Sequence, residues 1–77
     1  MSRTRKLRPM TDSERTELER LARSRSDEIR LVERARTIRA VYGGKRIKCA
    51  AQAAGRAVPT VSQWLTRFEE LGLEGLR

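Results

Sequence analysis

Apolar side chains at helical spacing are the feature that most limits the fold of this chain. Between residues 31 and 42 they recur at intervals of three and four: Leu31, Val32, Ala35, Ile38, Val41 and Tyr42. This spacing places them on one face of an α-helix. No segment alternates apolar and polar residues over the length of a strand, so we expect no sheet. At 77 residues the chain is one domain with a small core, because a chain this short buries only about 60% of its surface.

Start and stop signals predict four helices, at about 12–23, 27–42, 46–54 and 58–71. Thr11 to Glu14 fits a capping box at the first start. Ser24 to Asp27 supplies the next break and cap, and Gly43-Gly44 ends the second helix. Residues 1–10 hold basic residues and Pro9 but no acid, so we expect a flexible basic arm before a folded domain over 11–77.

The charge is strongly positive and unevenly distributed. Eighteen Lys and Arg against ten Asp and Glu give +8, with no His. Residues 34–68 contain no acid but hold eight bases: Arg34, Arg36, Arg39, Lys45, Arg46, Lys48, Arg56 and Arg67. A polyanion is the natural partner of such a window, although a charge run is more often only a solvated face. Composition alone leaves these two interpretations in balance.

Several function classes are disfavoured. Cys49 is the only cysteine, so we expect no internal disulfide, no metal site and a small half-buried helix residue. No catalytic constellation or phosphate-cradling loop is evident, so we expect no enzyme, cofactor or small-molecule ligand. No apolar run has membrane-spanning length, and no signal peptide is evident, which predicts a cytoplasmic, nucleoid-associated protein.

The spacing of Ala51, Gly55 and Val61 predicts a tight corner between the last two helices. Ala51 is small where the second helix passes over it, Gly55 opens the turn, and Val61 fills the space between the helices. The inward stripe of the last helix is Val61, Trp64, Leu65 and Phe68. Its outer face is Pro59, Thr60, Ser62, Gln63, Thr66 and Arg67. The fold class is therefore all-α, a compact helix-turn-helix bundle.

This outer face has the composition of a DNA-reading surface. Hydroxyl and amide side chains bond phosphates and base edges, and Gln63 can bond adenine through two hydrogen bonds. Any exposed helix face carries such residues, but here the corner, the acid-free window and the polar face coincide, which favours double-stranded DNA. Trp64 is either a core residue or a stacking platform for bases, and its stripe favours the core. Tyr42 either caps the core, which we favour, or bonds a phosphate.

The carboxy-terminal sequence resembles a known family. The segments are Ala50-Ala51-Gln52-Ala53-Ala54-Gly55 and, from Pro59 to Leu76, Pro-Thr-Val, then Trp, then Arg-Phe, then Gly-Leu-x-Gly-Leu. They resemble the amino-terminal helix-turn-helix of bacterial insertion-sequence transposases of the mariner-like superfamily, and the likeness covers about residues 11–77. It implies a module that binds transposon terminal inverted repeats, with the helix at Pro59–Arg67 in the major groove. The family's metal-dependent nuclease domain is not in this sequence.

Two departures from the family bear on the reading helix. Arg56 and Ala57 stand where the family has an apolar residue and a Ser or Thr cap, and Val58 takes the apolar role if the turn is longer. Arg46 and Cys49 likewise replace a common cap and a common acid, so this surface is more positive.

The resulting hypothesis assigns the contacts as follows. Pro59, Thr60, Ser62, Gln63, Thr66 and Arg67 face the duplex, and phosphates are held by Lys45, Arg46, Lys48 and Arg56. The arm residues Arg3, Arg5, Lys6 and Arg8 either enter a minor groove or stay mobile. Competing hypotheses are a stand-alone regulator or nucleoid protein, and a module that forms a homodimer or docks a missing catalytic domain through an apolar edge of Leu71, Leu73 and Leu76.

Overall fold

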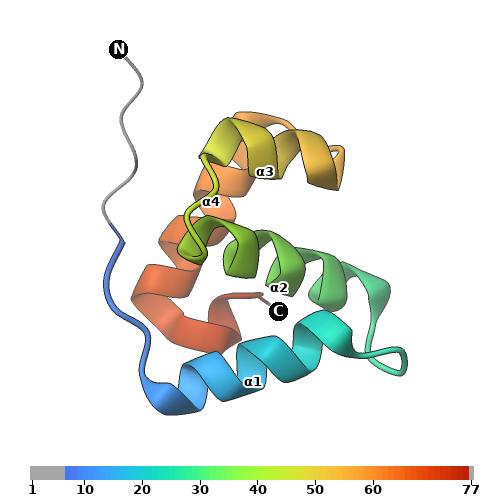
Figure 1. The fold of residues 1–77 in the computed structure, drawn as a ribbon, viewed down its shortest axis with the longest axis vertical. Coiled ribbons are helices and arrows are strands. Elements are labelled where there is room, and N and C mark those ends of the chain that lie inside the picture. Colours follow the sequence, from blue (N-terminus) through green and yellow to red (C-terminus); the bar gives the residue numbers. More distant parts are fainter. Residues whose placement is uncertain (1–6, 77) are drawn as a thin grey trace.

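The computed structural model describes residues 7–76 and shows four α-helices followed by a short 3-10 helix (Figure 1). The elements are α1 (Asp12–Arg23), α2 (Ile29–Tyr42), α3 (Ile47–Ala54), α4 (Val58–Leu71) and η1 (Gly72–Leu76). No strand occurs among these residues. The predicted all-α bundle is confirmed, and the predicted bounds of the first and last helices agree with those observed.

The start of α1 has the predicted capping box. The Thr11 hydroxyl accepts the Glu14 amide at 3.1 Å, and the Glu14 carboxylate accepts the Thr11 amide at 3.1 Å. The start of α2 differs from the prediction, because Ser24 and Asp27 do not cap it. The Ser24 hydroxyl accepts the Asp27 amide at 3.1 Å and donates to the Asp27 carboxylate at 2.6 Å, which builds a local turn. The helix therefore begins two residues later than expected, at Ile29, with no side-chain cap.

The core lies where the four helices meet. Its members are the apolar stripes of all four helices plus Leu76: Leu18, Leu21, Ala22, Val32, Ala35, Ile38, Val41, Ala50, Ala51, Val61, Trp64, Leu65, Phe68 and Leu76. Burial of these side chains is the main force that holds the helices together. Trp64 is 7% exposed, which confirms that it is a core residue and not an exposed stacking platform.

Tyr42 is a half-buried core residue, as favoured above. Its ring packs edge-on against Phe68 with 5.6 Å between the centroids, and its hydroxyl donates to the Arg8 carbonyl at 2.9 Å. Cys49, in contrast, is exposed, so the expectation of a half-buried thiol is wrong. It points outward because the small residues Ala50 and Ala51, which follow it, occupy the buried face of α3.

The residues after α4 fold back onto it. Gly72 has φ 65°, and η1 then carries Leu76 into the core at 1% exposure. Leu73 is only partly buried and packs against the core, whereas Leu71 is 62% exposed. The expected apolar edge of Leu71, Leu73 and Leu76 is therefore not formed, because η1 turns two of the three leucines inward.

Residues 7–10 also pack onto the bundle. Leu7 and Met10 contact the core. Arg8 links the residues before α1 to α1 itself and to the end of α4. Its guanidinium forms two hydrogen bonds with the Glu14 carboxylate, at 2.9 and 2.8 Å. It also donates to the carbonyls of Phe68 and Glu69 at 3.2 and 2.9 Å. This part of the expected arm is therefore attached to α1 and to the end of α4.

Candidate nucleic-acid interface

The corner between α3 and α4 depends on Gly55. This residue closes α3 in the left-handed conformation, with φ 68° and ψ 31°, where a side chain would be strained. The Arg56 amide donates back to the Ala51 carbonyl at 2.9 Å, and Ala57 then precedes α4. Ala51 and Val61 are both buried where the two helices meet. The roles predicted for Ala51, Gly55 and Val61 agree with this geometry.

Val58 does not take the apolar role suggested for it. It is the first residue of α4 and is 42% exposed. After the turn of three residues, Gly55 to Ala57, Val61 is the residue of α4 that is fully buried near its start, at 0% exposure. Ala57 leaves α4 without a side-chain cap, as its substitution for Ser or Thr predicts.

The outer face of α4 is polar and turned to solvent. Pro59, Gln63, Thr66 and Arg67 are exposed, while Thr60 and Ser62 are half-buried at its two margins. The Thr66 hydroxyl donates to the Ser62 carbonyl at 3.1 Å, within the helix itself. Glu70 is exposed on the same stripe, one turn after Thr66, so the stripe becomes acidic toward the end of α4. The part compatible with a polyanion is therefore residues 59–67.

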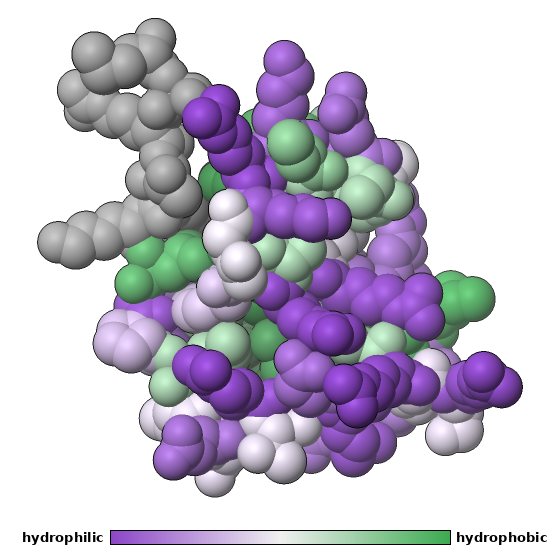
Figure 2. All heavy atoms as spheres, viewed as in Figure 1, coloured by the Kyte–Doolittle hydropathy of each residue, from purple (hydrophilic) through white to green (hydrophobic). Residues whose placement is uncertain are grey.

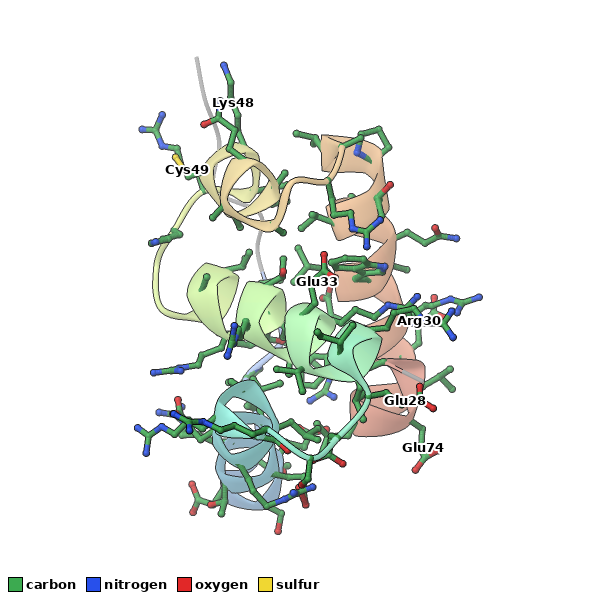
Figure 3. All side chains as sticks on the ribbon, turned by 90° about the vertical axis from the view of Figure 1, so that its right-hand side faces the viewer. Glu28, Arg30, Glu33, Lys48, Cys49 and Glu74 are labelled. Carbon is green, nitrogen blue, oxygen red and sulfur yellow. The ribbon has the colours of Figure 1, made fainter. Side chains whose placement is uncertain are left out.

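A second group of cations lies at α3 and the loop before it. Lys45, Arg46 and Lys48 are all exposed, and none forms a side-chain hydrogen bond or ion pair with another residue of the 7–76 segment. Hydrophilic side chains project from this edge of the molecule in Figure 2. Lys48 and Cys49 extend from α3 on the side away from α2 (Figure 3). Arg46 precedes α3 without capping it, so the first amides of α3 have no side-chain acceptor.

Half of the eight bases in the acid-free window are already engaged within the protein. Arg34 donates to the Leu76 carbonyl at 2.9 Å and lies over the Trp64 ring, 5.4 Å from its centroid. Arg36 donates to the Ala22 carbonyl at 2.9 Å, and Arg39 pairs with Glu19 at 3.0 Å. These arginines join α2 to its neighbours, and sequence spacing does not reveal this because every partner lies on another element.

Arg56 is the fourth engaged base, and this changes its expected role. Its Nε and Nη2 atoms donate to the two Glu33 carboxylate oxygens at 2.9 and 3.3 Å. Hydrogen bonding to Arg56 lowers the pKa of Glu33, and the same bond raises the pKa of Arg56. The predicted phosphate contact at Arg56 is therefore occupied by a carboxylate in the free protein. This role of Glu33 was not predicted from the sequence, because Glu33 lies one residue before the acid-free window.

The predicted site residues fall into two surface groups and a segment outside the described residues. Two groups of predicted residues lie at the surface of two helices that pack against each other. On α4 they are Pro59, Thr60, Ser62, Gln63, Thr66 and Arg67, and on α3 with the loop before it they are Lys45, Arg46 and Lys48. Arg3, Arg5 and Lys6 lie outside the described residues. Among residues 7–76, no cluster of three His, Cys, Asp or Glu side chains is arranged to hold a metal ion. In the same range no helix has the length and apolarity needed to cross a bilayer.

Comparison with known proteins agrees with this architecture. The family model described as a homeodomain-like domain matches residues 28–77, which span α2, α3, α4 and η1 and make up more than half of the chain. Neither curated proteins nor solved structures gave a match. The helix α1 precedes the matched region and adds a fourth helix to it. The chain therefore belongs to the homeodomain-like domain family, and its helix-turn-helix architecture indicates DNA as the partner.

Proposed function

We propose that this chain binds double-stranded DNA in a sequence-specific manner, with α4 as the recognition helix in the major groove. The observation that carries the proposal is the outer face of α4. Gln63 is exposed and takes no part in the core, and exposed cations stand on α3 and the loop before it, the helix that packs against α4. Docking of a second helix into the major groove is the general mode of helix-turn-helix modules.

The two groups of residues have separate tasks in this proposal. Lys45, Arg46 and Lys48 bind phosphates, which supplies most of the affinity without regard to sequence. Gln63 reads a base edge, because its amide carries both a donor and an acceptor that match adenine. Glu70 limits the reading surface, because a carboxylate near the phosphates is repelled. The proposal involves binding alone and no catalytic step.

We further propose that the DNA target is the terminal inverted repeat of a mobile element and that the chain acts as the amino-terminal module of a transposase. The support is the resemblance of the segment from Pro59 to Leu76 to such modules. In this structure the Gly-Leu-x-Gly-Leu part forms η1, which fastens Leu76 into the core. Those glycines thus serve the fold, and the contact with DNA rests on the residues before them.

Selection of bound sequences from a random duplex pool tests both the sequence-specific binding and the transposase role. The expected result is a defined motif of several base pairs, present at the two ends of the element that encodes the chain. A motif found upstream of unrelated genes would replace the transposase role by transcriptional regulation. Equal recovery of all sequences would contradict sequence-specific binding, and failure to retain duplex DNA at low salt would contradict DNA binding itself.

A further inference from the structure

The ion pair between Glu33 and Arg56 joins α2 to the turn of the DNA-binding motif. Arg56 follows Gly55 and lies two residues before the first residue of α4. Glu33 extends from α2 toward this turn (Figure 3) and accepts two hydrogen bonds from the guanidinium. The two residues are 23 positions apart in the sequence. The pair is therefore a tertiary contact made at the edge of the proposed interface.

The geometry of the pair leaves Arg56 able to change partner. The side chains of Arg56 and Glu33 are 47% and 29% exposed, so solvent weakens their attraction and little packing holds them. Only Nε and Nη2 contact Glu33 in the described structure, so Nη1 stays open to a further acceptor. A tetrahedral phosphate, like a planar carboxylate, presents two oxygen acceptors to the guanidinium, and arginine binds both through paired hydrogen bonds.

We propose that Glu33 acts as an internal phosphate mimic that holds Arg56 in the free protein and yields it to a DNA phosphate on binding. The inference rests on the proposed DNA-binding function and adds that Glu33 and a DNA phosphate compete for Arg56. Because the free protein already neutralises Arg56, this residue contributes less to affinity than an unpaired arginine would. Glu33 thus lowers the affinity for all duplexes, so that a duplex stays bound only where contacts in the groove compensate for this loss.

The position of α4 brings Arg56 close to a DNA phosphate, so the guanidinium can change partner from Glu33 to the phosphate without a large movement. A recognition helix in the major groove brings its amino-terminal end close to one phosphate strand. At this end of α4 the Pro59 nitrogen carries no hydrogen, and the Thr60 amide donates to the Ala57 carbonyl at 3.1 Å. The helix start therefore offers few amides to a phosphate, and the Arg56 guanidinium is the cation nearest to it in the chain.

The test measures the affinity of the full 77-residue chain for its selected duplex over a range of salt concentrations. Glu33→Gln should bind about 3–10-fold more tightly than the parent chain at low salt, while the slope of log K against log salt should stay close to that of the parent, because Arg56 binds the same phosphate in both complexes. Glu28→Gln is the matched control, because Glu28 is an exposed acid near the start of the same helix and is not paired with Arg56. Glu28→Gln should raise the affinity for DNA only as much as the removal of any one negative charge from the protein does.

A double-mutant cycle separates exchange from a purely structural role. In the Arg56→Ala background, Glu33→Gln should match Glu28→Gln, because no guanidinium remains to be released. If circular dichroism shows that Glu33→Gln is poorly folded, Glu33→Asp replaces it in the test. This variant keeps the charge but has a shorter side chain, so it should give an intermediate gain in affinity. Equal effects of Glu33→Gln and Glu28→Gln, or weaker binding by Glu33→Gln, would overturn the inference. If the parent chain itself fails to bind the duplex, the proposed function fails at an earlier and separate step.

Discussion

The backbone of Gly75 lies directly against that of Arg67. A Cβ atom at Gly75 would come within 2.3 Å of the Arg67 carbonyl oxygen and 2.6 Å of its carbonyl carbon. This close approach allows η1 to fold onto α4 and to bury Leu76. The second glycine of the Gly-Leu-x-Gly-Leu segment is thus required by packing between two backbones.

Gly75→Ala should therefore destabilise the fold. Because neither backbone can move away without detaching η1, we expect the free energy of unfolding to fall by about 2–3 kcal/mol. Urea denaturation followed by circular dichroism measures this loss. The control is Gly43→Ala, since Gly43 has φ −79° and its added Cβ would lie 3.3 Å from the Arg39 carbonyl oxygen. A Gly75→Ala protein as stable as Gly43→Ala would show that η1 does not hold α4.

Acid should weaken the fold through Glu14. Hydrogen bonding to Arg8 is the main cause that lowers the pKa of Glu14 from its ordinary 4.5 to about 2, with help from the Thr11 amide. The unfolded chain therefore takes up the proton first as the pH falls. The stabilisation is complete above pH 4.5 and is lost between about pH 4.5 and 2. Solvent screening at this partly exposed pair limits the loss to roughly 1 kcal/mol.

Thermal melts at pH 7, 4.5, 3 and 2 measure this effect. Glu14→Gln should be less stable at pH 7 and should lose less stability on acidification. Glu17→Gln removes the same charge from the same helix but leaves the contact between Arg8 and Glu14 intact, so it should retain the acid-induced loss. Identical pH profiles for the parent chain and Glu14→Gln would contradict the assignment.

Gln63→Ala should change sequence preference more than stability. Gln63 is exposed, so its truncation removes no core contact. Loss of a bidentate base contact reduces discrimination at one base pair by about 1–3 kcal/mol. Repeating the duplex selection with this variant should relax a single position of the motif. Gln52→Ala makes the same change on the exposed face of α3 and should leave the preferred motif unaltered.

Lys48→Ala should weaken binding to every duplex by a similar factor. If Lys48 contacts one phosphate, the salt slope should become shallower by about 0.9. Fluorescence anisotropy at several salt concentrations measures both the affinity and its salt slope. Arg15→Ala removes one exposed positive charge from α1, on the far side of the bundle, and should leave the slope nearly unchanged (Figure 1). Equal slopes for the two variants would exclude Lys48 from the interface.

The local features of this protein were predictable because short-range patterns encode them. The spacing of apolar residues identified the inward faces of α2 and α4, and Gly55 marked the left-handed corner. The capping box at Thr11 and Glu14 also followed from four consecutive residues. Each of these features depends on residues within a few positions of one another, where the helix geometry fixes their relation.

The availability of the charged residues was decided only by the tertiary structure. The sequence presents eight bases without an acid among them, yet Arg56 meets Glu33 from another helix, and Arg34 meets Leu76 and Trp64. The same holds for Leu76, whose burial depends on the reversal at Gly72. A long side chain bonds whichever group the fold brings within reach, and that distance is set by how the helices pack.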